Sequence, residues 1–66
     1  MSDYAVTIEP AEGGGFIALV PDLPGCMSDG ETVEEAWRSA QDAIAEWIDE
    51  ANRLGRSVPP PSRQVA

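Results

Sequence analysis

The sequence predicts a single α+β domain in which a three-stranded antiparallel meander precedes one long helix. Three observations predict it: an alternating run at the N-terminus, a Gly-rich turn before a continuous apolar run, and a capped amphipathic stretch in the second half. A chain of 66 residues has room for one domain with a marginal core. We place the domain at residues 1–58 and a Pro-rich tail at residues 59–66.

Residues 4–10, YAVTIEP, form the first expected strand. Tyr4, Val6 and Ile8 fall on one face and alternate with Ala5, Thr7 and Glu9 on the other. This alternation is typical of a half-buried strand, and Pro10 is expected to end it.

The glycines of the next segment, PAEGGG, predict a turn into a second strand, Phe16–Val20. This strand is apolar at every position, which indicates a central strand covered on both faces. A phosphate-binding loop is excluded because the glycines precede a strand, the chain contains no Lys, and the neighbours include Glu9 and Glu12.

Residues 21–25, PDLPG, should interrupt the sheet, since proline cannot donate a backbone hydrogen bond. Cys26–Ser28 can then form a short third strand before Asp29 and Gly30 turn the chain again. The first half of the chain therefore predicts a three-stranded meander.

The helix is expected to begin after Thr32, which is a favourable N-cap residue. Glu35 completes a capping box, and Glu34 favours the positive end of the helix dipole. Gly55 is placed as a C-cap, and the prolines at 59–61 rule out continuation. A helix over this range would be roughly 33 Å long.

The apolar stripe of this helix is broad enough to face a core. It consists of Val33, Trp37, Ala40, Ile44, Trp47, Ala51 and Leu54, widened by Ala36, Ala43 and Ile48. Because the stripe is longer than a small sheet can cover, we expect part of it to meet a second copy of the chain in a dimer or tetramer. The candidates for this core or oligomer interface are Phe16, Trp37, Ile44, Trp47 and Ile48.

The net charge of −8 is unevenly distributed. All four basic residues follow position 37, whereas eight acidic residues precede it. An acidic field of this kind repels nucleic acid and anionic lipid and favours a basic protein partner. The N-terminus lacks a signal-peptide pattern and no apolar run is long enough to span a membrane, so a cytoplasmic protein is expected.

The residue types argue against catalysis. Cys26 is the one cysteine and the chain has no His, so neither a disulfide, a Cys–His nucleophile nor a zinc site is expected, and Cys26 is predicted to be buried and inert. A hard cation could be held only by acidic turn residues such as Asp22, Asp29 and Glu31, which match no calcium-binding loop. We expect no catalytic residues, no cofactor and no metal.

The order of these elements resembles the HicB antitoxin family. The resemblance rests on the strand Tyr4–Glu9, GGFIALVPDLPGC at Gly14–Cys26, SDGETVEEA at Ser28–Ala36, the pair Trp47-Ile48, Gly55, and the VPPP segment at Val58–Pro61. It covers almost the whole chain, and the joint pattern is specific.

The resemblance implies an incomplete RNase H-like fold, often with a short fourth strand, here at Ser62–Ala66. It also implies a non-enzymatic function, the neutralisation of a small basic HicA-like mRNA-cleaving toxin by covering its RNA-binding and active face. The expected toxin-binding residues are Asp22, Leu23, Asp29 and Glu31. Many members carry a C-terminal DNA-binding domain, and this chain ends soon after VPPP, so direct DNA binding is not expected.

Two alternatives from other classes stay open. The RNase H-like fold could retain a divalent-metal nuclease activity, which requires several converging carboxylates, yet Thr7 and Glu9 are the only polar residues inside the first two strands. The chain could also be a stand-alone homo-oligomeric domain that binds a small ligand, although no polar pocket signature is visible.

Overall fold

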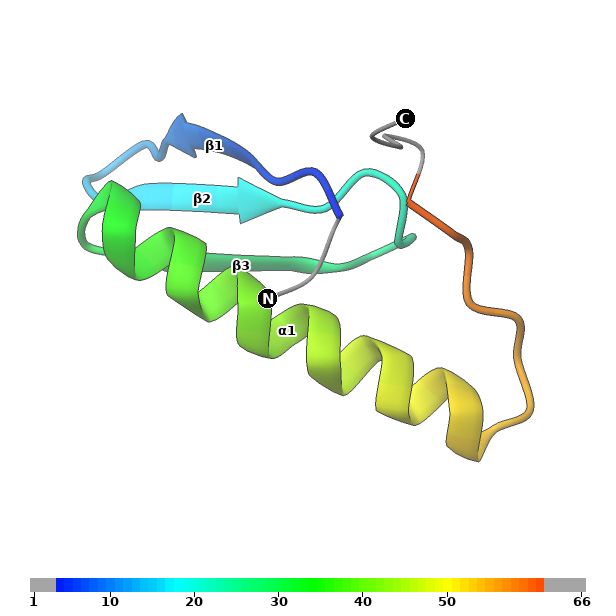
Figure 1. The fold of residues 1–66 in the computed structure, drawn as a ribbon. Coiled ribbons are helices and arrows are strands. Elements are labelled where there is room, and N and C mark those ends of the chain that lie inside the picture. The colour runs from blue at the N-terminus through cyan, green and yellow to red at the C-terminus, as the bar shows by residue number, and fades with distance from the viewer. Residues whose placement is uncertain (1–3, 62–66) are drawn as a thin grey trace.

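The computed structural model describes residues 4–61 and has three strands followed by one helix (Figure 1). The strands are β1 (Thr7–Pro10), β2 (Phe16–Leu19) and β3 (Met27–Gly30), and the helix is α1 (Val33–Arg53). They form one antiparallel sheet in the order β1-β2-β3, with β2 in the centre. The predicted α+β class and meander are confirmed, and the expected fourth strand at 62–66 lies outside the described residues.

The first strand is shorter than predicted, because it starts at Thr7 and not at Tyr4. Thr7 pairs with Leu19, the last residue of β2, so the residues before Thr7 have no strand beside them. Tyr4 and Val6 still pack against the core, as the alternation predicted. Pro10 is the last residue of β1, a position that an edge strand tolerates.

The glycines at 13–15 form the hairpin turn that the sequence predicted. All three have positive φ, at 89°, 114° and 77°, a region in which side chains other than glycine are strained. The Ala11 N–H donates to Gly15 O at 3.0 Å and closes the turn. The Gly-rich stretch therefore leads the chain into the central strand.

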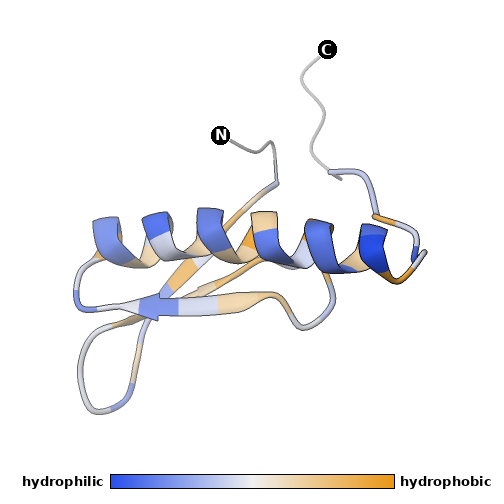
Figure 2. Ribbon diagram, turned by 90° about the horizontal axis from the view of Figure 1, so that it is seen from below, coloured by the Kyte–Doolittle hydropathy of each residue, from blue (hydrophilic) through white to orange (hydrophobic). Residues whose placement is uncertain are grey.

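The helix covers one face of the sheet, and small side chains allow it to lie close. Ala18 of β2 and Ala36 and Ala40 of α1 are fully buried and pack together, with Ile8 and Phe16 beside them. Figure 2 shows hydrophobic residues alternating with hydrophilic ones along α1, with the strands on one side of it. The prediction that β2 is covered on both faces is wrong, because within residues 4–61 the one helix or strand outside the sheet is α1, and it lies on a single face.

A second buried cluster lies beneath the middle of α1. It contains Val20, Leu23, Cys26 and Ile44. The loop between β2 and β3 folds inward through hydrogen bonds from Leu23 N–H to Val20 O, at 3.1 Å, and from Cys26 N–H to Leu23 O, at 2.9 Å. This turn carries the Leu23 side chain into the core.

Both ends of α1 are capped. The Thr32 hydroxyl accepts from the Glu35 N–H at 3.1 Å, so the predicted N-cap is confirmed. The second bond of the expected capping box is displaced by one residue, because the Glu35 carboxylate accepts from the N–H of Glu31, at 3.1 Å, and not from that of Thr32. The C-cap is Leu54, one residue before the predicted Gly55. Gly55, at φ +73°, instead forms the turn after the helix, in which the Arg56 N–H donates to Ala51 O at 2.8 Å.

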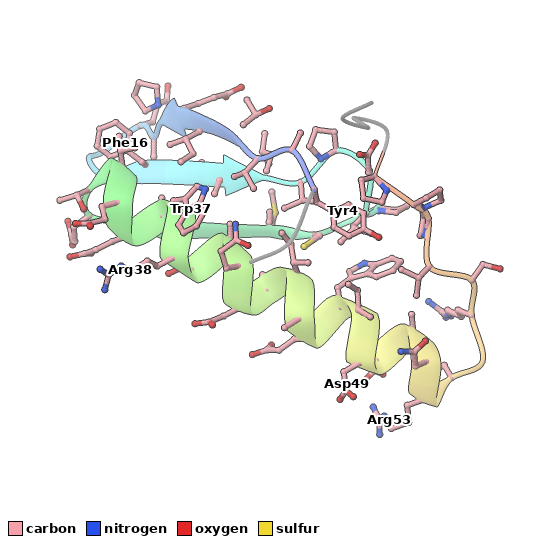
Figure 3. The ribbon with its side chains drawn as sticks, in the orientation of Figure 1. Tyr4, Phe16, Trp37, Arg38, Asp49 and Arg53 are labelled. Carbon is pink, nitrogen blue, oxygen red and sulfur yellow. The ribbon has the colours of Figure 1, made fainter. Side chains whose placement is uncertain are left out.

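The segment after α1 runs back toward the N-terminal part of the chain (Figure 1). The Tyr4 hydroxyl donates a hydrogen bond to Pro59 O, and Figure 3 shows Tyr4 on the side of the sheet nearest this segment. The start of the Pro-rich tail is therefore joined to the strand side of the domain.

Candidate functional site

The sheet presents an uncovered face that combines apolar and acidic residues. Successive side chains of a strand point to opposite faces, and Ile8, Phe16 and Ala18 pack on the helix side. The opposite side therefore carries the residues between them and their partners in register. This open sheet face consists of Thr7, Glu9, Ile17, Leu19, Met27 and Asp29.

The strand register arranges the open sheet face in two rows. In one row Ile17 lies between Glu9 and Asp29, and in the other Leu19 lies between Thr7 and Met27. Neighbouring strands are about 4.8 Å apart, so the two carboxylates flank Ile17 at a separation of roughly 10 Å. Glu9, Asp29 and Met27 are exposed, with Met27 at 57%. The surface is an apolar centre with negative charge on both sides.

The predicted toxin-binding residues fall in different environments. Asp29 lies on the open sheet face, and Glu31 is exposed just after β3. Asp22 is half-buried in the loop between β2 and β3. Leu23 is 1% exposed because the inward turn buries it, so its side chain offers almost no surface to a partner.

Four of the five residues predicted for a core or oligomer interface pack within the chain. Ile44 belongs to the second buried cluster, Trp47 and Ile48 pack against it, and Phe16 packs beside the buried alanines. The Trp47 indole N–H donates to Pro24 O at 2.9 Å, which fixes the ring against the loop. Trp37, at 38% exposed, is the most accessible of the five.

Sequence reasoning missed Glu9, Ile17, Leu19 and Met27 as members of one surface. The apolar run in β2 predicts two buried faces, and this interpretation assigns its odd-numbered positions to the core. The acidic residues on the adjacent strands were the available signal. Glu9 and Asp29 share the register position of Ile17, and a buried face would not carry an unpaired carboxylate on each side of one residue.

Cys26 is buried, as predicted, and burial raises the pKa of its thiol above the ordinary value. We expect thiol-specific reagents to label Cys26 far more slowly in the folded protein than in urea, because the thiolate is the reactive form. In the unfolded chain the Cys26 thiol has its ordinary, lower pKa and loses its proton at a lower pH. The contribution of Cys26 to stability should therefore be complete below that ordinary pKa and should be lost as pH rises through the raised pKa of the folded protein. Labelling rates measured with and without urea test this, and equal rates would contradict it.

Metal-binding geometry is absent from the described part of the chain. Among residues 4–61, no three acidic or cysteine side chains come together in a way that could hold a metal ion. Asp22, Asp29 and Glu31 thus do not assemble into a cation site there. In the same residues, no helical segment combines the length and apolar character needed to cross a membrane.

Comparison with known proteins gives a match over nearly the whole chain. Residues 4–65 match the model of a family described as the HicB-like antitoxin of bacterial toxin–antitoxin systems. The matched range contains all four elements and the whole open sheet face.

Individual relatives agree with the family match. The UPF0150 protein ssl0259 of Synechocystis is 31% identical over 64 residues, covering 97% of this chain and 88% of the relative. Antitoxin HicB of Escherichia coli K12 is 37% identical over 59 residues, covering 89% of this chain but 43% of the relative. Antitoxin HicB 1 of Photorhabdus laumondii is 46% identical over 41 residues, covering 62% of this chain and 26% of the relative. The chain therefore spans less than half of either HicB antitoxin, and it belongs to the HicB-like antitoxin family of bacterial toxin–antitoxin systems.

Proposed function

We propose that this protein neutralises a small basic HicA-like mRNA-cleaving toxin by binding it through the open sheet face. Family membership supports a toxin partner. The observation that carries the proposal is the row Glu9–Ile17–Asp29, in which an apolar side chain lies between two exposed carboxylates. The protein acts in the cytoplasm as a binding protein and performs no chemistry on RNA.

The charge of this surface favours a basic partner over a second copy of the chain. The open sheet face carries two acidic residues and no basic residue. Two such faces packed together would bring carboxylates toward carboxylates, whereas Lys or Arg residues around an apolar patch would pair with Glu9 and Asp29. A ribonuclease needs positive charge to hold the phosphates of RNA. The antitoxin would therefore compete with RNA for the same basic residues.

Reversing both acids of the central row should weaken neutralisation without unfolding the protein. In the variant Glu9→Lys/Asp29→Lys both changed side chains are exposed, so the core is untouched. We expect association with the toxin to slow by about tenfold or more, because electrostatic steering would be reversed. The measurement is growth rescue on co-expression with a HicA-like toxin, followed by association rates from surface plasmon resonance.

The matched control is Asp42→Lys/Asp49→Lys, which makes the same change in net charge on exposed positions of α1. Figure 3 shows Asp49 pointing away from the sheet. This variant should retain growth rescue and most of the association rate. Equal losses in the two variants would show that only net charge matters, and absence of any complex with the wild-type chain would refute the proposed function.

A further inference from the structure

The open sheet face is too small to hold a partner protein by itself. Each of its three strands has four residues, so the sheet is roughly 13 Å long and roughly 14 Å wide. Its face therefore measures roughly 200 Å², whereas a stable complex buries about 800 Å² of each partner. A toxin that binds there needs contacts with neighbouring parts of the domain as well.

Two turns bring further acidic residues to one end of this face. The hairpin turn carries Glu12, and the turn between β3 and α1 carries Glu31; both side chains are exposed. The two turns lie together, because a Cβ added to Gly15 would be 2.9 Å from Gly30 O. Figure 1 shows them at the same end of the molecule as the first turn of α1. The row that holds the two carboxylates of the open sheet face lies one position from this end.

Two large apolar side chains are exposed at the same end. Val33 is 50% exposed and Trp37 is 38% exposed. They are four positions apart on α1 and so are neighbours on one face of the helix. The chain passes from Asp29 on the open sheet face to Val33 within four residues, which places this Val33/Trp37 patch beside the acidic turns. Figure 3 shows Phe16 and Trp37 toward this end of the molecule.

The charges around the Val33/Trp37 patch favour a basic partner. Glu31, Glu34 and Glu35 are exposed in the first turn of α1 or just before it. The first half of α1 has one basic residue, Arg38, and its guanidinium forms an ion pair of 3.5 Å with the Glu34 carboxylate. Lys and Arg residues of a partner would meet these carboxylates while its apolar groups cover the patch. A second copy placed here about a two-fold axis would instead bring the same acidic residues together.

The opposite end of the domain suits a basic partner less well. Leu54 is 52% exposed there, but Arg53 and Arg56 lie beside it and are also exposed. Figure 3 shows Arg53 pointing outward from the end of α1. These are two of the four basic residues of the chain, and they would repel the Lys and Arg residues of a toxin.

We propose that the toxin contacts the Val33/Trp37 patch in addition to the open sheet face, so that its basic surface wraps around the acidic end of the domain. The partner is the toxin of the proposed function, on which this inference rests. Trp37 supplies the larger apolar contact, and tryptophan is among the residues whose truncation most weakens protein interfaces. The carboxylates mainly speed association, whereas the covered apolar side chains mainly slow dissociation.

Binding kinetics separate the two parts of this surface. Surface plasmon resonance with a HicA-like toxin compares the wild-type chain with the variants Trp37→Ala and Val33→Ser. Both variants should dissociate faster, by about tenfold or more for Trp37→Ala, with association close to that of the wild type. The variant Glu9→Lys/Asp29→Lys should instead associate more slowly. Circular dichroism verifies folding, and Val33→Ser, at a half-exposed position, provides the test if Trp37→Ala does not fold.

The matched control is Leu54→Ala, which truncates a half-exposed apolar side chain at the opposite end of α1. Its dissociation rate should equal that of the wild type. Unchanged dissociation in the folded patch variants, or an equal rise with Leu54→Ala, would overturn the inference. The proposed function would still stand if Glu9→Lys/Asp29→Lys slowed association.

Two further outcomes separate the possible occupants and surfaces. Normal association of Glu9→Lys/Asp29→Lys combined with faster dissociation of Trp37→Ala would refute the open sheet face as the toxin site and support the Val33/Trp37 patch. Sedimentation velocity without toxin should give the same mass for the wild type and Trp37→Ala. A smaller mass for Trp37→Ala would assign the patch to a second copy of the chain and overturn the inference.

Discussion

Replacing Gly30 with alanine should be among the most damaging single changes in this protein. An added Cβ would lie 2.4 Å from Ala36 N and 2.7 Å from the carbonyl carbon of Glu35, both in the backbone of the first turn of α1. A helix backbone cannot avoid this contact by changing a rotamer. The helix would have to move off the sheet and open the contact among Ala18, Ala36 and Ala40.

The expected loss for Gly30→Ala is about 3 kcal/mol or more, at the upper end of the range for overpacked sites. A domain of this size has a total stability of roughly 3–10 kcal/mol, so the melting temperature should fall by roughly 10–25 °C. Thermal unfolding followed by circular dichroism measures this shift. A large fraction of the Gly30→Ala chains should be unfolded at physiological temperature.

The control for this prediction is Gly13→Ala. At Gly13 an added Cβ meets nothing within 4 Å, and only the positive φ of +89° disfavours the substitution, at a cost of about 1–2 kcal/mol. The two variants thus separate a backbone preference from a steric collision. If Gly13→Ala destabilised the protein as much as Gly30→Ala, the close contact between β3 and α1 would be refuted.

Leu23→Ala should reduce stability strongly and should affect toxin binding only through the loss of folded protein. Leu23 packs with Val20, Cys26 and Ile44, and truncation of a buried leucine costs about 2–5 kcal/mol because it also leaves a cavity. Urea unfolding should show a lower midpoint. The affinity of the remaining folded fraction for the toxin should equal that of the wild type.

Leu54→Ala provides the matched leucine control, because Leu54 is about half exposed. The Leu54→Ala variant should change the free energy of unfolding by less than about 1 kcal/mol. An equal effect of the two substitutions would contradict the burial of Leu23. A folded Leu23→Ala variant with weakened toxin binding would restore Leu23 as a contact residue.

The parts of the fold that depend on local sequence were predicted correctly. Thr32 and Glu35 cap the helix through bonds within one turn, and the glycines at 13–15 supply positive φ at the turn where they stand. These interactions involve residues close together in the chain, so residue type and spacing are sufficient to identify them. The α+β class and the order of the elements do not by themselves establish an RNase H-like fold, and that assignment stays a prediction.

The candidate site depended on information that no local pattern carries. The face occupied by Ile17 is known only once its pairing with Glu9 and Asp29 is known. Leu23 lies between two prolines and beside an aspartate, a composition typical of an exposed turn. The hydrogen bonds that turn it inward involve Val20 and Cys26, and nothing in the segment's periodicity indicates them.

The hydrogen bond between Tyr4 and Pro59 has a consequence for the order of folding. The sheet is built from strands that are consecutive in the chain, and α1 follows β3 after two residues, so these parts require only short loops to close. Tyr4 and Pro59 are 55 positions apart, and closing a longer loop costs more entropy. We expect this link to form last and open first, so that proteolytic cleavage between Arg56 and Val58 would release the tail while the sheet and helix stay assembled.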